Sequence, residues 1–243
     1  MNDQTNGVQN SRTPLAPVHS GQEGFGVIWD MDGTMVDTAE LHFRAWQATA
    51  AELGRPFSRT DFQATFGRRN PDILHILFGT RFSEQEMTLI GDRKEEMYRA
   101  AAQAGVEPLP GVLDLLQMFR GLGFRQAIGS SAPRANVELI LSLTQTQNYF
   151  DAFVGMEDVA RGKPDPQVFL RAAQMLQVIP ERCLVLEDAV AGVQAAKAGG
   201  MKCIAVRFVG HHESEALRAA GADLVVDTLV EVGLEIVKLL MQA

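Results

Sequence analysis

Short apolar segments recur along this chain and alternate with segments that have helical periodicity. The apolar segments lie at residues 26–29, 124–128, 152–155, 183–186, 203–206 and 223–226. The helical patterns between them lie at residues 111–122, 136–143, 166–176 and 191–199. Because strands that alternate with helices form parallel sheets covered on both faces, we expect an α/β fold with a doubly wound parallel sheet.

Residues 39–104 interrupt this alternation. Their helical patterns lie at residues 39–54, 72–77 and 83–104, and the segment shows no strand pattern. The sequence PLPG at residues 108–111 favours a turn and marks the return to the sheet. We therefore predict a Rossmann-like core with an inserted all-helical cap domain. The predicted parts are a mobile tail at residues 1–24, a core at residues 25–38 and 105–243, and a helical cap at residues 39–104.

Acidic residues follow two of the predicted strands directly. Asp30 and Asp32 come after the first strand, and Glu187 and Asp188 come after a later one. In a parallel sheet these strand ends meet at one edge, where ligands bind. Clustered carboxylates repel one another unless a cation holds them, and hard oxygen ligands suit Mg²⁺. One such pair alone is also typical of an ordinary turn, but two pairs predict a magnesium site.

The spacing of the first pair points to a particular chemistry. Residues two apart on an extended backbone place their side chains on the same side, so Asp30 and Asp32 are predicted to act together. One carboxylate attacks a phosphate ester as a nucleophile, and the other handles the proton of the leaving oxygen. We assign the nucleophile to Asp30.

Polar groups near other strand ends are candidates for holding phosphoryl oxygens. Ser130 and Ser131 follow the predicted strand at 124–128, where hydroxyl and backbone N–H groups can bind phosphate. A helix N-cap is the alternative role for one of them. Lys163 lies in GKPDP at residues 162–166, and its ammonium would balance the carboxylate charge.

These motifs together resemble those of the haloacid dehalogenase-like hydrolases. The matching motifs, in order, are DMDGT at 30–34, Ser130, GKPDP at 162–166, and EDAVAG at 187–192. The resemblance implies that Asp30 is the nucleophile and a metal ligand and that Asp32 is the general acid/base. The implied metal ligands are Asp30, Asp32, Glu187 and Asp188, with Asp32 contributing its backbone carbonyl. The implied phosphate contacts are Thr34, Ser130 and Lys163.

The helical insert resembles the cap of a subgroup that contains β-phosphoglucomutases and sugar-phosphate phosphatases. The resemblance implies that Thr38 and His42 lie at the hinge and that Lys94 contacts the substrate. His42 packing beneath the cap is the alternative. The cap also carries Arg68 and Arg69 as candidate substrate-binding residues, with ordinary solvated arginines as the alternative.

The cap sequence departs from the mutase pattern at one point. Asn70 stands where the mutases have the arginine that binds a second phosphate, and Phe66 stands where they have a lysine. We therefore expect a magnesium-dependent phosphatase that acts on a small phosphorylated metabolite, a sugar phosphate, through an aspartyl-phosphate. A phosphosugar mutase that uses the same Asp30 is the alternative. A sensor that binds sugar phosphates without catalysis is a third possibility, which the intact acidic set disfavours.

Composition limits the partners and the compartment. The formal net charge is -8, which disfavours nucleic acid and anionic lipid as partners. No apolar segment is long enough to span a membrane, and the first 24 residues lack the apolar block of a signal peptide. The two cysteines, Cys183 and Cys203, lie in apolar segments and are expected to be buried thiols. We therefore expect a cytoplasmic protein, with a monomer as the default.

Overall fold

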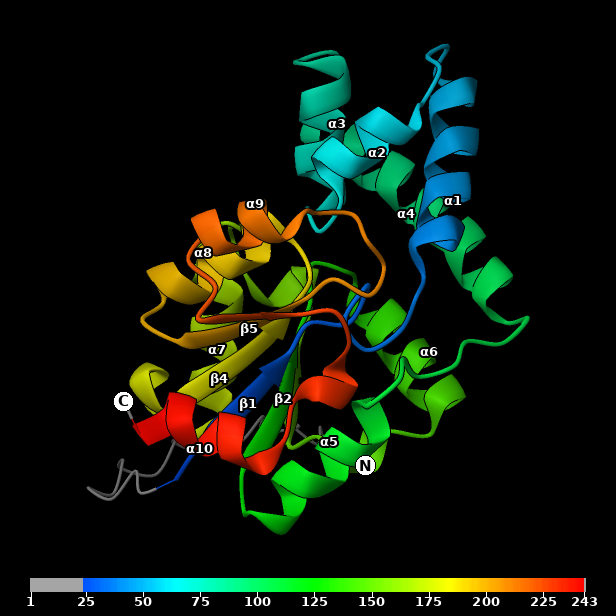
Figure 1. The fold of residues 1–243 in the computed structure, drawn as a ribbon. Coiled ribbons are helices and arrows are strands. Elements are labelled where there is room, and N and C mark those ends of the chain that lie inside the picture. The colour runs from blue at the N-terminus through cyan, green and yellow to red at the C-terminus, as the bar shows by residue number, and fades with distance from the viewer. Residues whose placement is uncertain (1–23, 243) are drawn as a thin grey trace, which may run out of the picture.

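The structure is a computed structural model that describes residues 24–242. Of the predicted tail at residues 1–24, all but Gly24 lies outside the described residues. A six-stranded sheet forms the centre of the molecule (Figure 1). Its strands are β1 (Gly26–Trp29), β2 (Arg125–Gly129), β3 (Ala152–Val154), β4 (Cys183–Glu187), β5 (Lys202–Val206) and β6 (Leu224–Val226). Every pairing between neighbouring strands is parallel, in the order β3-β2-β1-β4-β5-β6.

Helices cover both faces of this sheet, as the sequence predicts. The core helices are α5 (Val112–Gly121), α6 (Arg134–Thr144), α7 (Gln167–Leu176), α8 (Val190–Ala198), α9 (Ser214–Ala219) and α10 (Leu234–Gln242). Short 3-10 turns are η1 (Gln147–Tyr149), η2 (Met156–Asp158), η3 (Pro180–Arg182) and η4 (Leu229–Glu231). Side chains alternate along each strand, so Trp29 belongs to the hydrophobic cluster that includes residues of α5, α6 and α10. Ile28 belongs to the cluster on the other face, which includes residues of α7, α8 and α9. Both cysteines are buried and free, and the predicted doubly wound α/β fold is confirmed.

Four helices lie between β1 and α5 in the chain and stand above one edge of the sheet (Figure 1). We call them the cap: α1 (Ala39–Glu52), α2 (Arg59–Thr65), α3 (Asn70–Phe78) and α4 (Glu84–Ala102). The cap has a hydrophobic cluster of its own, rich in aromatic rings that include Phe43, Trp46 and Phe62. A separate core of this kind gives the four helices a reason to pack together as one unit.

One cap helix was not predicted. The helix α2 has seven residues, too few for a clear apolar period. Its signal is instead a capping box, in which Ser58 and Asp61 each accept a hydrogen bond from the other's backbone N–H. The helix α3 begins at Asn70, two residues before the predicted start, because Pro71 fits the first helical turn.

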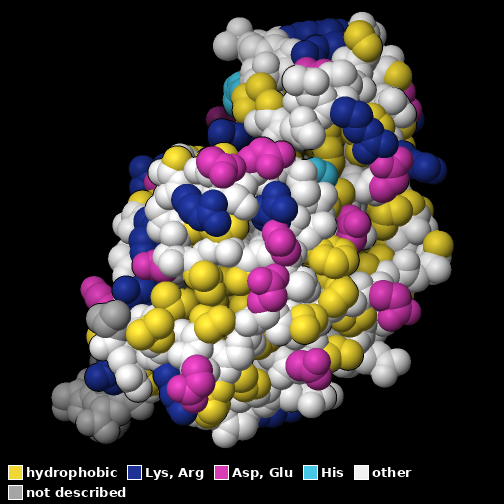
Figure 2. All heavy atoms as spheres, in the orientation of Figure 1, with side chains coloured by type: hydrophobic (Ala, Val, Ile, Leu, Met, Phe, Trp, Pro, Cys, Tyr) yellow, Lys and Arg dark blue, Asp and Glu magenta, His cyan; other side chains and the backbone are white. Residues whose placement is uncertain are grey.

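Exposed hydrophobic side chains gather over the lower part of the core on the face drawn in Figure 2. Separately, the large hydrophobic residues that are exposed among the described residues include Leu113 of α5, Val230 of η4 and Leu239 of α10. Among residues 24–242, no helix is both long enough and apolar enough to cross a membrane.

Candidate active site

The acidic residues after β1 and β4 meet at the carboxyl edge of the sheet. Both strands pair in register, so that Trp29 lies opposite Leu186 and Asp30 donates its N–H to the Leu186 carbonyl at 2.9 Å. Carboxylate oxygens of Asp30, Glu187 and Asp188 lie within 4.8 Å of one another, and all three side chains are buried. The structure thus brings these three predicted metal ligands together.

Lys163 is the cation inside this cluster. Its ammonium donates to Asp30 Oδ1 at 2.5 Å and to Glu187 Oε2 at 2.8 Å, and only 2% of the residue is exposed. The Coulombic attraction of the two carboxylates outweighs burial and raises the pKa of Lys163, so it stays charged. The lysine therefore fixes the carboxylates in place, as the sequence predicts for a charge-balancing group.

One ammonium does not neutralise three buried acids. Burial and the nearby Glu187 raise the pKa of Asp30 to about 8, although Lys163 opposes them. Burial and Glu187 also raise the pKa of Asp188 well above its usual range. The cluster is therefore short of positive charge, which a divalent cation would supply.

Two glycines make room for the carboxylates. Gly33 has a φ of +91°, and a Cβ there would collide with the Asp188 carboxylate. A Cβ on Gly192, in α8, would collide with the Glu187 carboxylate. The glycines of DMDGT and EDAVAG thus serve the packing of the acidic cluster.

Several buried polar atoms near the cluster have no hydrogen-bond partner among the described residues. They include Asp188 Oδ1, Thr34 Oγ1 and Ser131 Oγ. Ser130 differs, because its Oγ accepts the N–H of Ala132 at 3.0 Å within the loop after β2. The N-cap of α6 is Pro133 and has no side-chain hydrogen bond, so neither serine has the alternative role of a helix N-cap. Buried polar atoms without partners are costly in a folded protein, so they point to a ligand.

Asp32 faces a different environment, towards the cap. Its Oδ1 accepts hydrogen bonds from Thr38 Oγ1 at 2.5 Å, His42 Nε2 at 3.2 Å and Tyr98 Oη at 3.3 Å. Burial would raise the pKa of Asp32, but His42 and Thr38 outweigh it and lower the pKa. Because all three bonds go to Oδ1, Oδ2 is the oxygen left to exchange a proton.

His42 connects Asp32 to the cap. The Lys94 ammonium donates to His42 Nδ1 at 2.6 Å, which makes His42 Nε2 the donor to Asp32. Lys94 also donates to Glu95 Oε1 at 2.9 Å, and it is 1% exposed. Thus two of the four predicted cap residues, His42 and Lys94, belong to one buried hydrogen-bond network.

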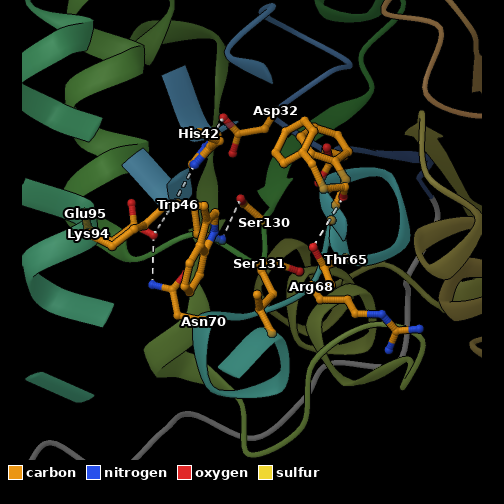
Figure 3. Close-up of a pocket in the computed structure, with 16 residues that line it drawn as sticks. Asp32, His42, Trp46, Thr65, Arg68, Asn70, Lys94, Glu95, Ser130 and Ser131 are labelled. Atoms are coloured by element: carbon orange, nitrogen blue, oxygen red, sulfur yellow. Dashed lines mark hydrogen bonds and ion pairs between the residues drawn. The ribbon is translucent and has the colours of Figure 1, made fainter. Parts of the chain in front are cut away.

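A pocket lies between the cap and the sheet edge (Figure 3). Its core side is lined by Asp30, Asp32, Ser130, Ser131 and Ala132. Its cap side is lined by His42, Trp46, Phe62, Thr65, Phe66, Gly67, Arg68, Asn70, Ile73, Lys94 and Glu95. Aromatic surface with a few polar groups is typical of a pocket for a small organic molecule.

The two candidate arginines of the cap lie in different places. Arg68 lines the pocket, with its guanidinium directed away from Lys94 and Glu95 (Figure 3). Arg69 instead pairs with Asp72 at 3.2 Å and donates to the Ala160 carbonyl at 3.0 Å. Arg69 therefore contacts the core loop that precedes Lys163, outside the pocket lining.

Sequence reasoning did not identify two polar residues of the network, Glu95 and Asn136. Glu95 Oε2 accepts from Asn136 Nδ2 of α6 at 2.7 Å, across 41 positions in the chain. Neither residue lies in a motif. An acid next to a lysine on a helix was the one available signal, and it is common on solvated surfaces.

A parallel α/β sheet with an acidic cluster at its carboxyl edge, under a helical cap, defines a class of α/β proteins that bind a ligand at a covered sheet edge. The family model of the haloacid dehalogenase-like hydrolases matches residues 26–200, and the chain belongs to this family. The predicted resemblance is therefore confirmed.

Similar proteins include two curated bacterial enzymes and a solved structure. Fructose-1-phosphate phosphatase from Escherichia coli K12 is 33% identical over 76% of this chain and 97% of its own. Beta-phosphoglucomutase from Bacillus subtilis is 33% identical over 86% of this chain and 92% of its own. The crystal structure of beta-phosphoglucomutase from Clostridium difficile matches with a TM-score of 0.81, at 25% identity, over 90% of this chain and 97% of its own.

Proposed function

We propose that this protein is a magnesium-dependent phosphatase of small phosphorylated metabolites, sugar monophosphates in particular. The observation that carries the proposal is the buried cluster of Asp30, Glu187 and Asp188 around Lys163, next to Asp32 in a cap-covered pocket. Support also comes from similarity to the fructose-1-phosphate phosphatase and to a phosphorylated-carbohydrate phosphatase of Thermotoga maritima, 30% identical over 81% of this chain.

The donor set at the sheet edge fits Mg²⁺. Asp30, Glu187 and Asp188 offer clustered oxygens, and Asp188 Oδ1 is buried without a partner among the described residues. We propose that Asp30 and Asp188 hold the ion, with Glu187 as a ligand or a support and the Asp32 carbonyl as a further ligand. When bound, Mg²⁺ neutralises charge on the carboxylates and on the phosphoryl oxygens.

In the first half of the proposed reaction, a carboxylate oxygen of Asp30 attacks phosphorus. The phosphorus–oxygen bond of the ester breaks, and the leaving oxygen takes a proton from Asp32. Lys163 holds Asp30 in place and offers positive charge to the phosphoryl oxygens. The free hydroxyls of Thr34 and Ser131, together with Ser130, are proposed to bind those oxygens.

In the second half, Asp32 takes a proton from a water molecule, and that water attacks the phosphorus of the aspartyl-phosphate. The bond between phosphorus and Asp30 breaks, which releases phosphate and restores the carboxylate. The lowered pKa of Asp32, which burial opposes and His42 and Thr38 bring about, favours the carboxylate form that this step needs. The proton that Asp32 takes from water here is the one that it gives to the leaving oxygen of the next substrate.

The cap is proposed to provide enclosure and specificity. We propose a boundary with the core at residues 38–39 and at 104–105, so that motion there opens and closes the pocket. Trp46, Phe62 and Phe66 would shield the reaction from bulk water and pack against the carbon skeleton of the substrate. A monomer in the cytoplasm, acting without nucleic acid or membrane, completes the proposal on the basis of the sequence.

Phosphate release from a panel of sugar monophosphates tests this function. We expect turnover by the wild type that requires Mg²⁺, is lost with a chelator, and returns when Mg²⁺ is restored. Asp30→Asn removes the nucleophile and should release no phosphate above the uncatalysed rate. Equal rates for wild type and this variant would overturn the proposal.

A phosphosugar mutase is the second candidate, favoured by the similarity to the Bacillus subtilis beta-phosphoglucomutase. The structure gives a reason to place it second. Asn70, at the position of the mutase arginine, is buried and donates to Glu95 at 2.8 Å. ³¹P NMR of β-glucose 1-phosphate with a trace of the 1,6-bisphosphate distinguishes the two: phosphatase action yields free phosphate, whereas glucose 6-phosphate would establish mutase action. Gain of mutase action by Asn70→Arg would identify the missing phosphate contact as the cause.

A further inference from the structure

Glu95 is a buried carboxylate in the cap wall of the pocket, and no step of the proposed reaction uses it. Its oxygens accept hydrogen bonds from three elements: Asn70 of α3 at 2.8 Å, Lys94 of α4 at 2.9 Å and Asn136 of α6 at 2.7 Å. Only 3% of the residue is exposed. Such a fully engaged carboxylate is fixed both in position and in its negative charge.

The partner that matters for the substrate is Lys94. Among the described residues that line the pocket, the lysines and arginines are Arg68 and Lys94. The guanidinium of Arg68 is directed away from the Lys94–Glu95 pair (Figure 3). Lys94 would therefore be the natural contact for a second anionic group on the substrate, but the Glu95 carboxylate lies 2.9 Å from its ammonium.

We propose that Glu95 determines specificity by neutralising Lys94, so that the pocket selects phosphate monoesters of uncharged polyols over substrates with a second anionic group. This inference rests on the proposed phosphatase function. A hydroxyl group can hydrogen-bond to a lysine–carboxylate pair as readily as to a free lysine. A second phosphate would instead meet a fixed negative charge in a site where charges are poorly screened.

The test compares two substrates that differ by one phosphate. We would measure kcat/KM for fructose 1-phosphate and for fructose 1,6-bisphosphate with wild type and with Glu95→Gln. Removing the charge leaves Lys94 free to attract the second phosphate, so the ratio of bisphosphate to monophosphate should rise about tenfold or more. A general loosening of the cap would lower kcat/KM for both substrates and leave the ratio unchanged.

Glu96→Gln is the matched control. It makes the same chemical change one position further along α4, at an exposed residue, and should leave the ratio unchanged. Lys94→Met should instead lower the ratio of bisphosphate to monophosphate, because it leaves the Glu95 carboxylate without its lysine beside the pocket.

A second variant guards against poor folding of Glu95→Gln. In Glu95→Gln/Asn136→Asp the two side chains exchange acid and amide, so a hydrogen bond between them remains. The negative charge moves to residue 136, whose side chain accepts a hydrogen bond from Arg99 at 3.0 Å in the wild type and does not line the pocket. This exchange should also raise the ratio about tenfold.

Unchanged ratios in both folded Glu95 variants would overturn the inference, as would a rise in Glu96→Gln. Failure of the underlying function looks different, because then the wild type releases phosphate from neither sugar.

Discussion

Asp30 and Asp32 lie two residues apart, yet their surroundings shift their acidity in opposite directions. Burial and Glu187 raise the pKa of Asp30 to about 8, whereas His42 and Thr38 lower the pKa of Asp32 against the effect of burial. The two carboxyl groups also have different neighbours, Lys163 for Asp30 and the cap network for Asp32. One DxD motif thus provides two chemically distinct groups, and the proposed nucleophile Asp30 needs a cation beside it to be ionised at neutral pH.

Lys163→Met tests how much the buried ammonium stabilises the cluster. Removing it leaves Asp30 and Glu187 without their shared partner, so we expect a loss of about 3 kcal/mol in the free energy of unfolding without metal. Urea denaturation measures this loss. Lys238→Met is the control: its exposed pair with Glu235 should contribute less than about 0.5 kcal/mol. Similar losses in the two variants would contradict the account.

Glu95 makes stability depend on pH at the acid end. Burial would raise the pKa of Glu95, but Lys94 and the hydrogen bonds outweigh it and lower the pKa to about 2 from 4.5. Because the pKa of Glu95 is lower in the folded state, its charged form adds to the free energy of unfolding above about pH 4.5. This contribution is lost as the pH falls towards 2. The wild type should therefore lose its stability advantage over Glu95→Gln as the pH falls through this interval. Denaturation of both proteins at a series of pH values measures this difference. A constant difference would refute a charged Glu95.

The turn after β1 shows how an element positions the site. It brings Gly33 against Asp188, and a Cβ at this glycine would meet that carboxylate. Gly54 has a similar φ, +78°, but a Cβ there would have nothing within 4 Å, so it isolates the cost of the backbone conformation.

Gly33→Ala should therefore cost more than Gly54→Ala. We expect about 1 kcal/mol for Gly54→Ala from its backbone alone, and about 2 kcal/mol beyond that for Gly33→Ala from the collision. Gly33→Ala should also lower phosphatase activity, whereas Gly54→Ala should not. Thermal or urea unfolding of both variants gives the comparison, and equal costs would contradict the packing role of Gly33.

The strands and most core helices could be predicted because their apolar periods are set by burial in a two-sided sheet. The acids after β1 and β4 could be predicted to meet because parallel strand ends share an edge. The cap contacts could not. Glu95 reaches Asn136, and Arg69 reaches Ala160, across 41 and 91 positions. Such contacts depend on how the cap sits on the core, which no local pattern encodes.

At the scale of the whole molecule, the cap contacts the core at several places. Arg69 donates to the Ala160 carbonyl, and the ring centroids of Phe66 and His211 lie 4.5 Å apart. Gly162 lies so close to Arg69 that a Cβ there would come within 2.6 Å of its Nε. Cap position is thus linked to the loop that carries Lys163.

Arg69→Ala tests this link. Loss of the contact should favour an open cap and lower kcat/KM for a sugar monophosphate roughly tenfold, about 1.4 kcal/mol. Amide hydrogen exchange should rise in residues 159–162. Arg44→Ala, at an exposed arginine of α1 paired with Glu40, is the control and should change neither quantity. If exchange and activity both stay at wild-type values in Arg69→Ala, the contact does not hold the cap.

The central claim is that Asp30 carries the phosphoryl group during turnover. Rapid quenching with a ³²P-labelled sugar monophosphate, followed by peptide mapping, tests it directly. With ³²P-labelled p-nitrophenyl phosphate, whose leaving group needs no proton, Asp32→Asn should slow only hydrolysis and let the label accumulate on Asp30, and Asp30→Asn should carry no label. Label on another residue, or phosphate release without any labelled enzyme in a trapping variant, would contradict the account.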